Sequence, residues 1–356
     1  MSSKIQIRVG AVDIGGGAPV SVQSMTNTDS RDAEATLGQI RSLAAYGCEI
    51  VRVAVPDQAA VEALADITAE SPLPVIADIH FKADLAIASA GSGAAGLRIN
   101  PGNIGSRERV KDVVEAARAA GIPIRIGVNS GSLPREKREL SDKQPARALV
   151  ETILDYVTLF EELDFRDFKV SAKSASVTET IEANLMLGSE IDYPINLGVT
   201  EAGTLRSGSI KSAVGLGALL AQGVGDTIRV SLTGDPVEEV RVGYEILKSL
   251  GLREHGPDLI SCPTCGRTEI DLESIALEVE RRLAEYENAF EVAVMGCVVN
   301  GPGEARRADF GIAGGKGEGL IFSHGKPIRK VQAENLVEAL FEEIEKSCEK
   351  QSPEKP

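Results

Sequence analysis

Three cysteines near the C-terminus have the types and spacing of ligands for a soft metal. Cys262 and Cys265 form a Cys-x-x-Cys pair, and Cys297 follows in the segment Met-Gly-Cys-Val-Val-Asn-Gly-Pro-Gly-Glu, which ends at Glu304. Iron and zinc both bind thiolates, but a structural zinc site has four cysteine or histidine ligands. No fourth such ligand follows at suitable spacing. The pattern favours an iron–sulfur cluster on three thiolates with a weak or open fourth position; zinc is the alternative.

A second set of residues, mostly basic, lies at the ends of short apolar segments. Residues two apart in a strand point the same way, and this parity aligns Asp78 with His80, Arg98 with Asn100, Arg125 with Asn129, Ser171 with Lys173, and Arg229 with Ser231. Arginine binds phosphate oxygens through paired N–H groups, and lysine adds a point charge. We name Arg52, Arg98, Arg125, Lys173 and Arg229 the basic ring. A salt bridge explains one such arginine, but five basic residues of shared parity predict a substrate with two or more phosphates.

Further polar residues accompany the basic ring. Asn129 and Ser231 share its parity, and Lys211 is expected to join it from the segment after the seventh strand. His80 lies beside Asp78, and Glu201 ends the seventh strand. We therefore expect these side chains to line the same site as the ring.

The elements that must position these residues alternate along the chain. Helical patterns, many of them followed by glycine, separate eight short apolar segments: 20–26, 50–55, 74–80, 96–100, 123–129, 168–173, 194–200 and 227–232. This order predicts an α/β fold, a TIM (β/α)8 barrel with its active site at the carboxyl ends of the strands. An open doubly wound sheet is the alternative. The first residues predict a hairpin at the bottom of the barrel.

The sequence predicts two domains and a tail. Residues 1–250 form the substrate-binding barrel, residues 251–348 a small α+β domain that holds the cluster, and residues 349–356 a disordered tail. The chain of 356 residues has a net charge of −15, which argues against general nucleic-acid binding. No apolar run has the length of a membrane span and the first residues lack a signal peptide, so we expect a cytoplasmic protein with reduced thiols.

Several motifs also resemble one known family. The segments ADIHF, LRINPGN, RIGVNSGSL, LGVTEAG, GDTIRVSLTG, CPTCGR and VMGCVVNGPGEA resemble the two-domain bacterial 4-hydroxy-3-methylbut-2-enyl diphosphate synthases of the non-mevalonate isoprenoid pathway. The resemblance covers about residues 4–345. It implies 2-C-methyl-D-erythritol 2,4-cyclodiphosphate as substrate and a [4Fe–4S] cluster on Cys262, Cys265, Cys297 and Glu304. It also implies two electrons from a flavodoxin or ferredoxin.

The implied reaction is a reductive dehydroxylation with ring opening, and it needs a proton for the departing hydroxyl. Glu201, which resembles the family's barrel acid, is the first candidate donor, and His80 is the second. Two other interpretations remain open at this stage. The first is a protein without catalysis, either an electron carrier, which would not need the basic ring, or a zinc- or cluster-containing anion-binding module. The second is a pterin-binding barrel synthase, which would not need the cysteines.

The attachment point of the small domain predicts how two chains assemble. Helix eight of a barrel returns the chain to the bottom, so the small domain is attached at the end opposite the active site. The connection, about residues 250–261, spans at most roughly 40 Å when extended. We therefore expect a homodimer in which the cluster domain of one chain caps the barrel of its partner, an arrangement that the resemblance also implies.

Overall fold

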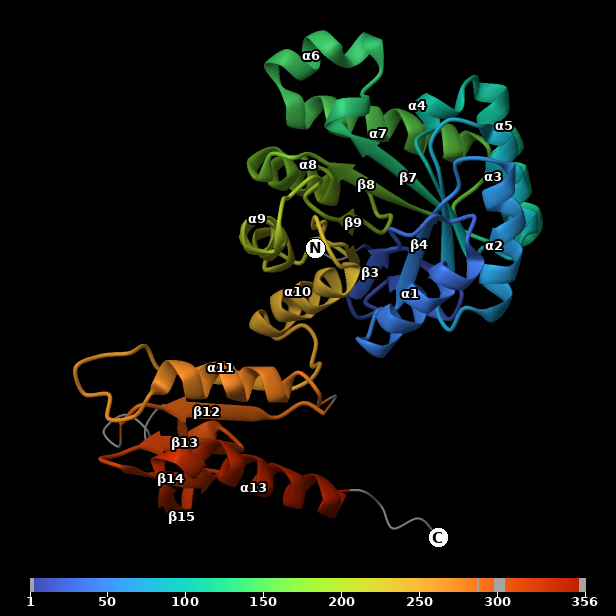
Figure 1. Ribbon diagram of the computed structural model, residues 1–356. Coiled ribbons are helices and arrows are strands. Elements are labelled where there is room, and N and C mark those ends of the chain that lie inside the picture. Colours follow the sequence, from blue (N-terminus) through green and yellow to red (C-terminus); the bar gives the residue numbers. More distant parts are fainter. Residues whose placement is uncertain (1–2, 287, 298–304, 352–356) are drawn as a thin grey trace. The chain divides into compact units, whose positions relative to one another are not determined.

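The computed structural model describes residues 3–286, 288–297 and 305–351. After Arg253 the chain divides into two compact units, each with its own sheet and its own apolar core (Figure 1). Helix α13 (Leu336–Gln351) includes residues 349–351 of the segment predicted to be disordered, and residues 352–356 lie outside the described residues. None of the helices in the described part of the chain has the length and apolar character needed to cross a bilayer.

The first unit is the predicted barrel. Its parallel sheet has the order β8-β7-β6-β5-β4-β3-β10-β9, and a parallel bridge between Val170 and Ile195 joins the two ends. This closure confirms the TIM barrel and shows that the open doubly wound alternative is wrong. The strands are β3 (Ser21–Met25), β4 (Ile50–Ala54), β5 (Val75–Ile79), β6 (Gly96–Ile99), β7 (Ile124–Asn129), β8 (Phe168–Lys173), β9 (Asn196–Leu197) and β10 (Thr227–Ile228).

The last two barrel strands are shorter than the sequence predicts. Each has two paired residues, whereas the apolar segments span 194–200 and 227–232. The backbone beyond them is still tied by single contacts, such as the Arg229 N–H to the Leu197 carbonyl. The polar residues at the ends of these segments therefore lie in loops anchored to the barrel.

Helices surround the barrel because each packs apolar residues against the strands, and four of those named below begin at a side chain that caps the first turn. Asp32, Asp57, Ser176 and Asp235 each accept a backbone N–H of the first helical turn. The helices are α1 (Ala33–Ala45), α2 (Gln58–Glu70), α3 (Ala83–Gly91), α5 (Arg107–Ala120), α7 (Pro145–Glu162), α8 (Val177–Glu190), α9 (Leu205–Leu220) and α10 (Pro236–Ser249). Short helices α4 (Pro101–Ile104) and α6 (Arg138–Lys143) lie in the connections that follow β6 and β7.

A hairpin closes the amino-terminal end of the barrel, as predicted. Strands β1 (Gln6–Val9) and β2 (Val12–Gly15) pair antiparallel. Ile7, Val9 and Ile14 pack against Ile50 and Ile76, which lie near the starts of β4 and β5. Substrate therefore has access from the opposite end, where the strands end.

The second unit is a small α+β domain. Its sheet has the order β11-β12-β13-β14-β15. The first three strands run parallel to one another, and β14 pairs antiparallel with both β13 and β15. Residues of α11 (Leu272–Leu283) and α13 pack together with Val292 and Ile312 in one core, whereas Ala293 and Met295 pack with Ala305 and Ala308 in another. The strands are β11 (Asp258–Ser261), β12 (Glu291–Met295), β13 (Phe310–Gly314), β14 (Glu318–Ser323) and β15 (Lys326–Gln332).

Candidate active site

Asp78 is the acidic centre of the basic ring. Its carboxylate lies 3.3 Å from Arg52 Nε and 3.1 Å from Arg98 Nη1. All three residues come from neighbouring strands, β4, β5 and β6, and all three are buried. Their side chains point into the barrel because the residues that alternate with them along the strands, such as Val51 and Val53, face the helices. One carboxylate thus bridges two guanidinium groups inside the barrel.

This arrangement controls the charge state of Asp78. Burial by itself raises the pKa of the carboxyl group, but Arg52 and Arg98 outweigh burial and lower the pKa to about 2. Asp78 is therefore ionised at neutral pH. A buried carboxylate between two arginines holds them in place, but it also takes up part of their charge.

His80 lies at the edge of the same cluster. Its Nε2 is 2.8 Å from Arg98 Nη1 and 3.8 Å from Asp78 Oδ2. Burial and the nearby arginines lower the pKa of the imidazole, although Asp78 acts to raise it. Arg98 Nη1 also lies 3.4 Å from Nδ1, and because a guanidinium can only donate, the ring nitrogen that takes its hydrogen bond is an acceptor. His80 is therefore neutral in this geometry.

Arg125 and Lys173 have no carboxylate partner among the described residues. Arg125 Nη1 donates to the Asn196 side-chain oxygen at 2.8 Å, and its Nε has no partner in the described part of the chain. Burial and the other arginines hold the pKa values of both side chains well below their usual ranges. A Cβ at Gly198 would lie 2.6 Å from Lys173 Nζ, so this glycine makes room for the ammonium group. These two cations lack an anion to balance them.

Arg229 completes the basic ring from the loop after β10. It donates to Ser231 Oγ at 2.6 Å and forms two hydrogen bonds with Glu239 of α10. Asn129 ends β7 and pairs in register with Lys173. Lys211 stays a predicted member of the site. It is exposed in α9, and the described residues include no ion pair or hydrogen bond that joins it to the ring.

Glu201 lies on the rim of the barrel in an uncommon backbone conformation. Its φ is +51°, in the left-handed region that residues other than glycine rarely adopt, and its side chain is exposed. Such conformations persist where the surrounding structure enforces them, and they cluster at functional sites. The following segment supplies that support, because Gly203 bridges Leu232 and its carbonyl accepts the Thr233 N–H.

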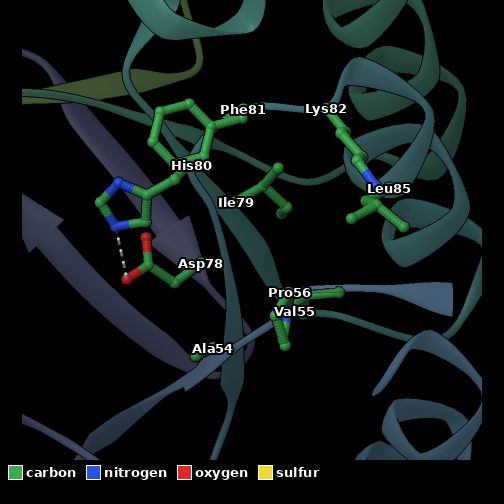
Figure 2. Close-up of a pocket in the computed structure, with 9 residues that line it drawn as sticks. All are labelled: Ala54, Val55, Pro56, Asp78, Ile79, His80, Phe81, Lys82 and Leu85. Atoms are coloured by element: carbon green, nitrogen blue, oxygen red, sulfur yellow. Dashed lines mark ion pairs between the residues drawn. The ribbon is translucent and has the colours of Figure 1, made fainter. Parts of the chain in front are cut away.

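A cavity opens beside the Asp78–His80 pair. It has a volume of about 270 Å³ and is lined mostly by apolar groups from the ends of β4 and β5 and the start of α3. Figure 2 shows Asp78 and His80 side by side, with Phe81, Lys82 and Leu85 labelled around the cavity. Asp78 and His80 are thus shared between the charged cluster and the wall of this cavity.

Two of the predicted cluster ligands, Cys262 and Cys297, lie beyond the carboxyl ends of adjacent strands in the sheet of the small domain. Cys262 follows β11 and Cys297 follows β12, and these parallel strands pair side by side with Ser261 opposite Val294. Cys262 Sγ accepts the Gly296 N–H at 3.2 Å. Cys265 is exposed, and backbone hydrogen bonding near Arg267 lowers its thiol pKa. All three are free thiols.

This donor set fits an iron–sulfur cluster. Thiolates at the carboxyl ends of adjacent strands, with a backbone N–H directed at one sulfur, are the ligand type and hydrogen bonding that such clusters require. Within the described residues, no three histidine, cysteine or acidic side chains form a complete metal-binding group. Glu304, the predicted fourth ligand, lies outside the described residues with the rest of 298–304.

Two polar partners of the ring were not predicted from the sequence. Asn196 is buried in β9, and Glu239 is buried in α10 with its carboxylate on Arg229. Asn196 precedes Leu197 in the predicted strand 194–200, so strand parity alone could have assigned its side chain to the barrel interior. For Glu239 the sequence carries no signal, because an acid in the first turns of a helix usually faces solvent.

Asp78 yields a stability prediction. Asp78→Asn should lower the free energy of unfolding by about 3 kcal/mol at neutral pH, because it leaves Arg52 and Arg98 buried without their counter-charge. In the unmodified protein this contribution is present above the ordinary carboxyl pKa and is lost as the pH falls from about 4 toward about 2, because the folded-state pKa is the lower one. Urea unfolding at several pH values measures both effects.

Asp13→Asn is the matched control for that prediction. Asp13 pairs with Arg8 at 2.8 Å, but both side chains are exposed, so the loss of this pair should change stability little. Equal stability of Asp78→Asn and the unmodified protein at pH 7 would contradict the assigned role of Asp78.

Two family models match this chain. The GcpE TIM-barrel domain matches residues 4–244, and the GcpE protein C-terminal domain matches residues 258–346. A protein from Geobacter sulfurreducens is 60% identical over 341 residues, covering 96% of this chain and 97% of that protein. One from Clostridium acetobutylicum is 55% identical over 340 residues, with 96% and 97% covered. Both are named 4-hydroxy-3-methylbut-2-en-1-yl diphosphate synthase (flavodoxin).

Solved structures share the barrel at low sequence identity. A dihydropteroate synthase from Stenotrophomonas maltophilia has a TM-score of 0.52 and 14% identity, and it aligns with 69% of this chain and 97% of its own. One from Vibrio fischeri has a TM-score of 0.50 and 12% identity, with 69% and 98% covered. At this identity the likeness concerns the fold alone, so it does not support the pterin-binding alternative.

Proposed function

We propose that this chain, which belongs to the GcpE family, is a 4-hydroxy-3-methylbut-2-enyl diphosphate synthase. The substrate would be 2-C-methyl-D-erythritol 2,4-cyclodiphosphate, and the reaction a two-electron reductive dehydroxylation with ring opening. The relatives that share more than half of their residues with this chain carry that name. The observation that carries the proposal is the set of buried cations at the barrel end.

The charge balance of the basic ring supports a diphosphate substrate. In the described structure only two acids counter its five basic residues. Asp78 pairs with Arg52 and Arg98, and Glu239 pairs with Arg229. Arg125 and Lys173 have no acidic partner there. An anion with two phosphates would supply that partner, and it would also satisfy the free Nε–H of Arg125. Asn129 and Ser231, at the same strand ends, would add hydrogen bonds.

Cys262, Cys265 and Cys297 would hold a [4Fe–4S] cluster, with Glu304 as the fourth ligand. A carboxylate is a harder ligand than a thiolate and is more easily displaced, which suits the position where substrate must approach. When bound, the cluster supplies electrons one at a time. The Gly296 N–H directed at Cys262 Sγ would stabilise the ligating thiolate.

Glu201 would donate the proton with which the substrate hydroxyl leaves as water. Its carboxyl group is exposed on the rim, where it can reach a bound substrate, and its left-handed backbone fixes the direction of the side chain. His80 is the second candidate. In the geometry described the imidazole accepts a hydrogen bond from Arg98, so His80 would have to take up a proton before it could pass one to the departing hydroxyl.

Flavodoxin is the proposed electron donor, because the relatives' names specify it; ferredoxin is the alternative. We also propose the homodimer in which each cluster domain caps the partner's barrel. Mixing an inactive Cys297→Ser chain with an inactive Glu201→Gln chain should then restore activity, because some mixed dimers contain one intact site. If subunits exchange and no activity returns, the cluster must act within its own chain.

The diphosphate site gives a direct binding prediction. Arg125→Ala should weaken binding of the cyclodiphosphate by roughly 10- to 100-fold, which is the loss expected for one charge-assisted contact. Isothermal titration of the anaerobically purified protein measures the dissociation constant.

Arg166→Ala is the control for the binding prediction. Arg166 pairs with Glu161 on the outside of the barrel, with 62% of its side chain exposed, so its removal should leave the affinity unchanged. If Arg125→Ala binds the cyclodiphosphate as tightly as the unmodified protein does, the substrate site must be elsewhere.

A further inference from the structure

Glu239 is a buried acid that joins three separate elements at the basic ring. Its carboxylate accepts hydrogen bonds from Arg229 Nε at 3.1 Å and Nη2 at 2.8 Å. It also accepts the Ser24 hydroxyl at 2.9 Å and the Leu232 backbone N–H at 3.0 Å. Glu239 is 3% exposed, so these four contacts replace its hydration. This one side chain therefore connects α10 with β3 and with the loop after β10, which carries Arg229.

The hydrogen bonds determine which edge of Arg229 remains free. A guanidinium has five N–H donors. Glu239 takes the Nε and one Nη2 donor, and Ser231 takes one Nη1 donor. Among the described residues one donor on each terminal nitrogen is left, and each can donate to a phosphate oxygen. Glu239 therefore fixes Arg229 by one edge and leaves the other edge for an anion.

The same carboxylate supports the loop that reaches Glu201. Leu232, whose N–H donates to Glu239, forms a parallel bridge with Gly203, and the Thr233 N–H donates to the Gly203 carbonyl. Gly203 lies two residues after Glu201, which has the left-handed backbone. The position of the rim acid thus depends on a loop held by Glu239.

We propose that Glu239 is a positioning residue, which orients Arg229 for the substrate diphosphate and holds the 231–234 loop against the segment that carries Glu201. The inference rests on the proposed function, because it takes the ligand of Arg229 to be the cyclodiphosphate. Glu239 itself does not contact substrate in this assignment. Its carboxylate acts through the guanidinium and through the backbone of the loop.

Glu239→Gln tests this role, because it keeps the shape and removes the charge that holds Arg229. The holoenzyme should bind the cyclodiphosphate about 10-fold more weakly or worse. In an Arg229→Ala background the same substitution should change the dissociation constant less than about 2-fold, because the residue through which Glu239 acts on the diphosphate is gone. KM should rise along with the dissociation constant, and kcat should fall as well because the Glu201 segment loosens.

Glu49→Gln is the matched control. Glu49 also accepts two hydrogen bonds from one arginine, Arg253, and one strand N–H, that of Val22, but it lies at the amino-terminal end of the barrel. Its replacement should affect thermal stability and leave the dissociation constant unchanged. Should Glu239→Gln fail to fold, Glu239→Asp provides the same test, because it keeps the charge and withdraws the carboxylate from Arg229.

Three results would overturn the inference. Binding by Glu239→Gln equal to that of the unmodified protein would show that Arg229 needs no such support. An equal loss in the presence and absence of Arg229 would show that Glu239 acts by another route. If Arg229→Ala alone binds substrate normally, both the proposed diphosphate site and this inference fail. If Arg229→Ala weakens binding and Glu239→Gln does not, only the positioning role of Glu239 fails.

Discussion

Replacing Cys297 by serine should abolish both the cluster and turnover. Cys297 is buried at the end of β12, next to the strand that leads to Cys262, so its sulfur would supply one of three thiolate ligands. A serine hydroxyl is a much weaker ligand for iron than a thiolate. Iron analysis after anaerobic purification should fall from about four per chain to near zero. The visible absorption of the cluster should be lost in parallel.

Cys48→Ser is the control for loss of a thiol. Cys48 is buried in the barrel core, donates to the Ile50 carbonyl at 3.2 Å, and has its thiol pKa raised to about 12 by burial. A thiol that stays protonated does not ligate iron. Its replacement should leave the iron content unchanged. Full iron content in Cys297→Ser would contradict the assigned ligand set.

Replacing Glu201 by glutamine should remove most of the rate and preserve binding. Glutamine has the same shape as glutamate, but it has no transferable acid proton. We expect turnover to fall by roughly 100-fold or more, and the dissociation constant of the cyclodiphosphate to stay within about 2-fold. Steady-state kinetics with reduced flavodoxin and a binding titration measure the two quantities separately.

Asp164→Asn is the matched control for that experiment. Asp164 is also an exposed acid in the left-handed region, with φ of +52°, but it lies in the turn after α7, which leads into the amino-terminal end of β8. The same change from acid to amide should have no effect on rate there. A near-normal rate for Glu201→Gln would transfer the proton-donating role to His80 or to water.

The sequence predicts the basic ring well because a parallel barrel converts strand parity into position. Arg52 and Arg98 occupy alternate positions between valine, leucine or isoleucine residues that face the helices, so their side chains could only point into the barrel. The acid between them, Asp78, follows from the same rule. Their mutual distances follow from the register of three adjacent strands.

The remaining contacts depend on packing that no local pattern encodes. Glu239 reaches Arg229 only because α10 packs against β3, which places Ser24 beside the same carboxylate. Lys211 is exposed in α9, and its predicted place beside the ring rests on its position in the sequence. Glu304, the predicted fourth ligand, lies outside the described residues, and its assignment rests on the motif alone.

If this chain uses an iron–sulfur cluster to reduce a cyclic diphosphate, metal analysis and turnover of a single anaerobic preparation should show both the cluster and the reaction. The protein is purified without air, its iron and zinc are quantified, and the cyclodiphosphate is added with reduced flavodoxin or a chemical reductant while phosphorus NMR follows the products. The account predicts about four irons per chain and conversion to 4-hydroxy-3-methylbut-2-enyl diphosphate. Stoichiometric zinc without iron, together with unchanged cyclodiphosphate, would contradict it.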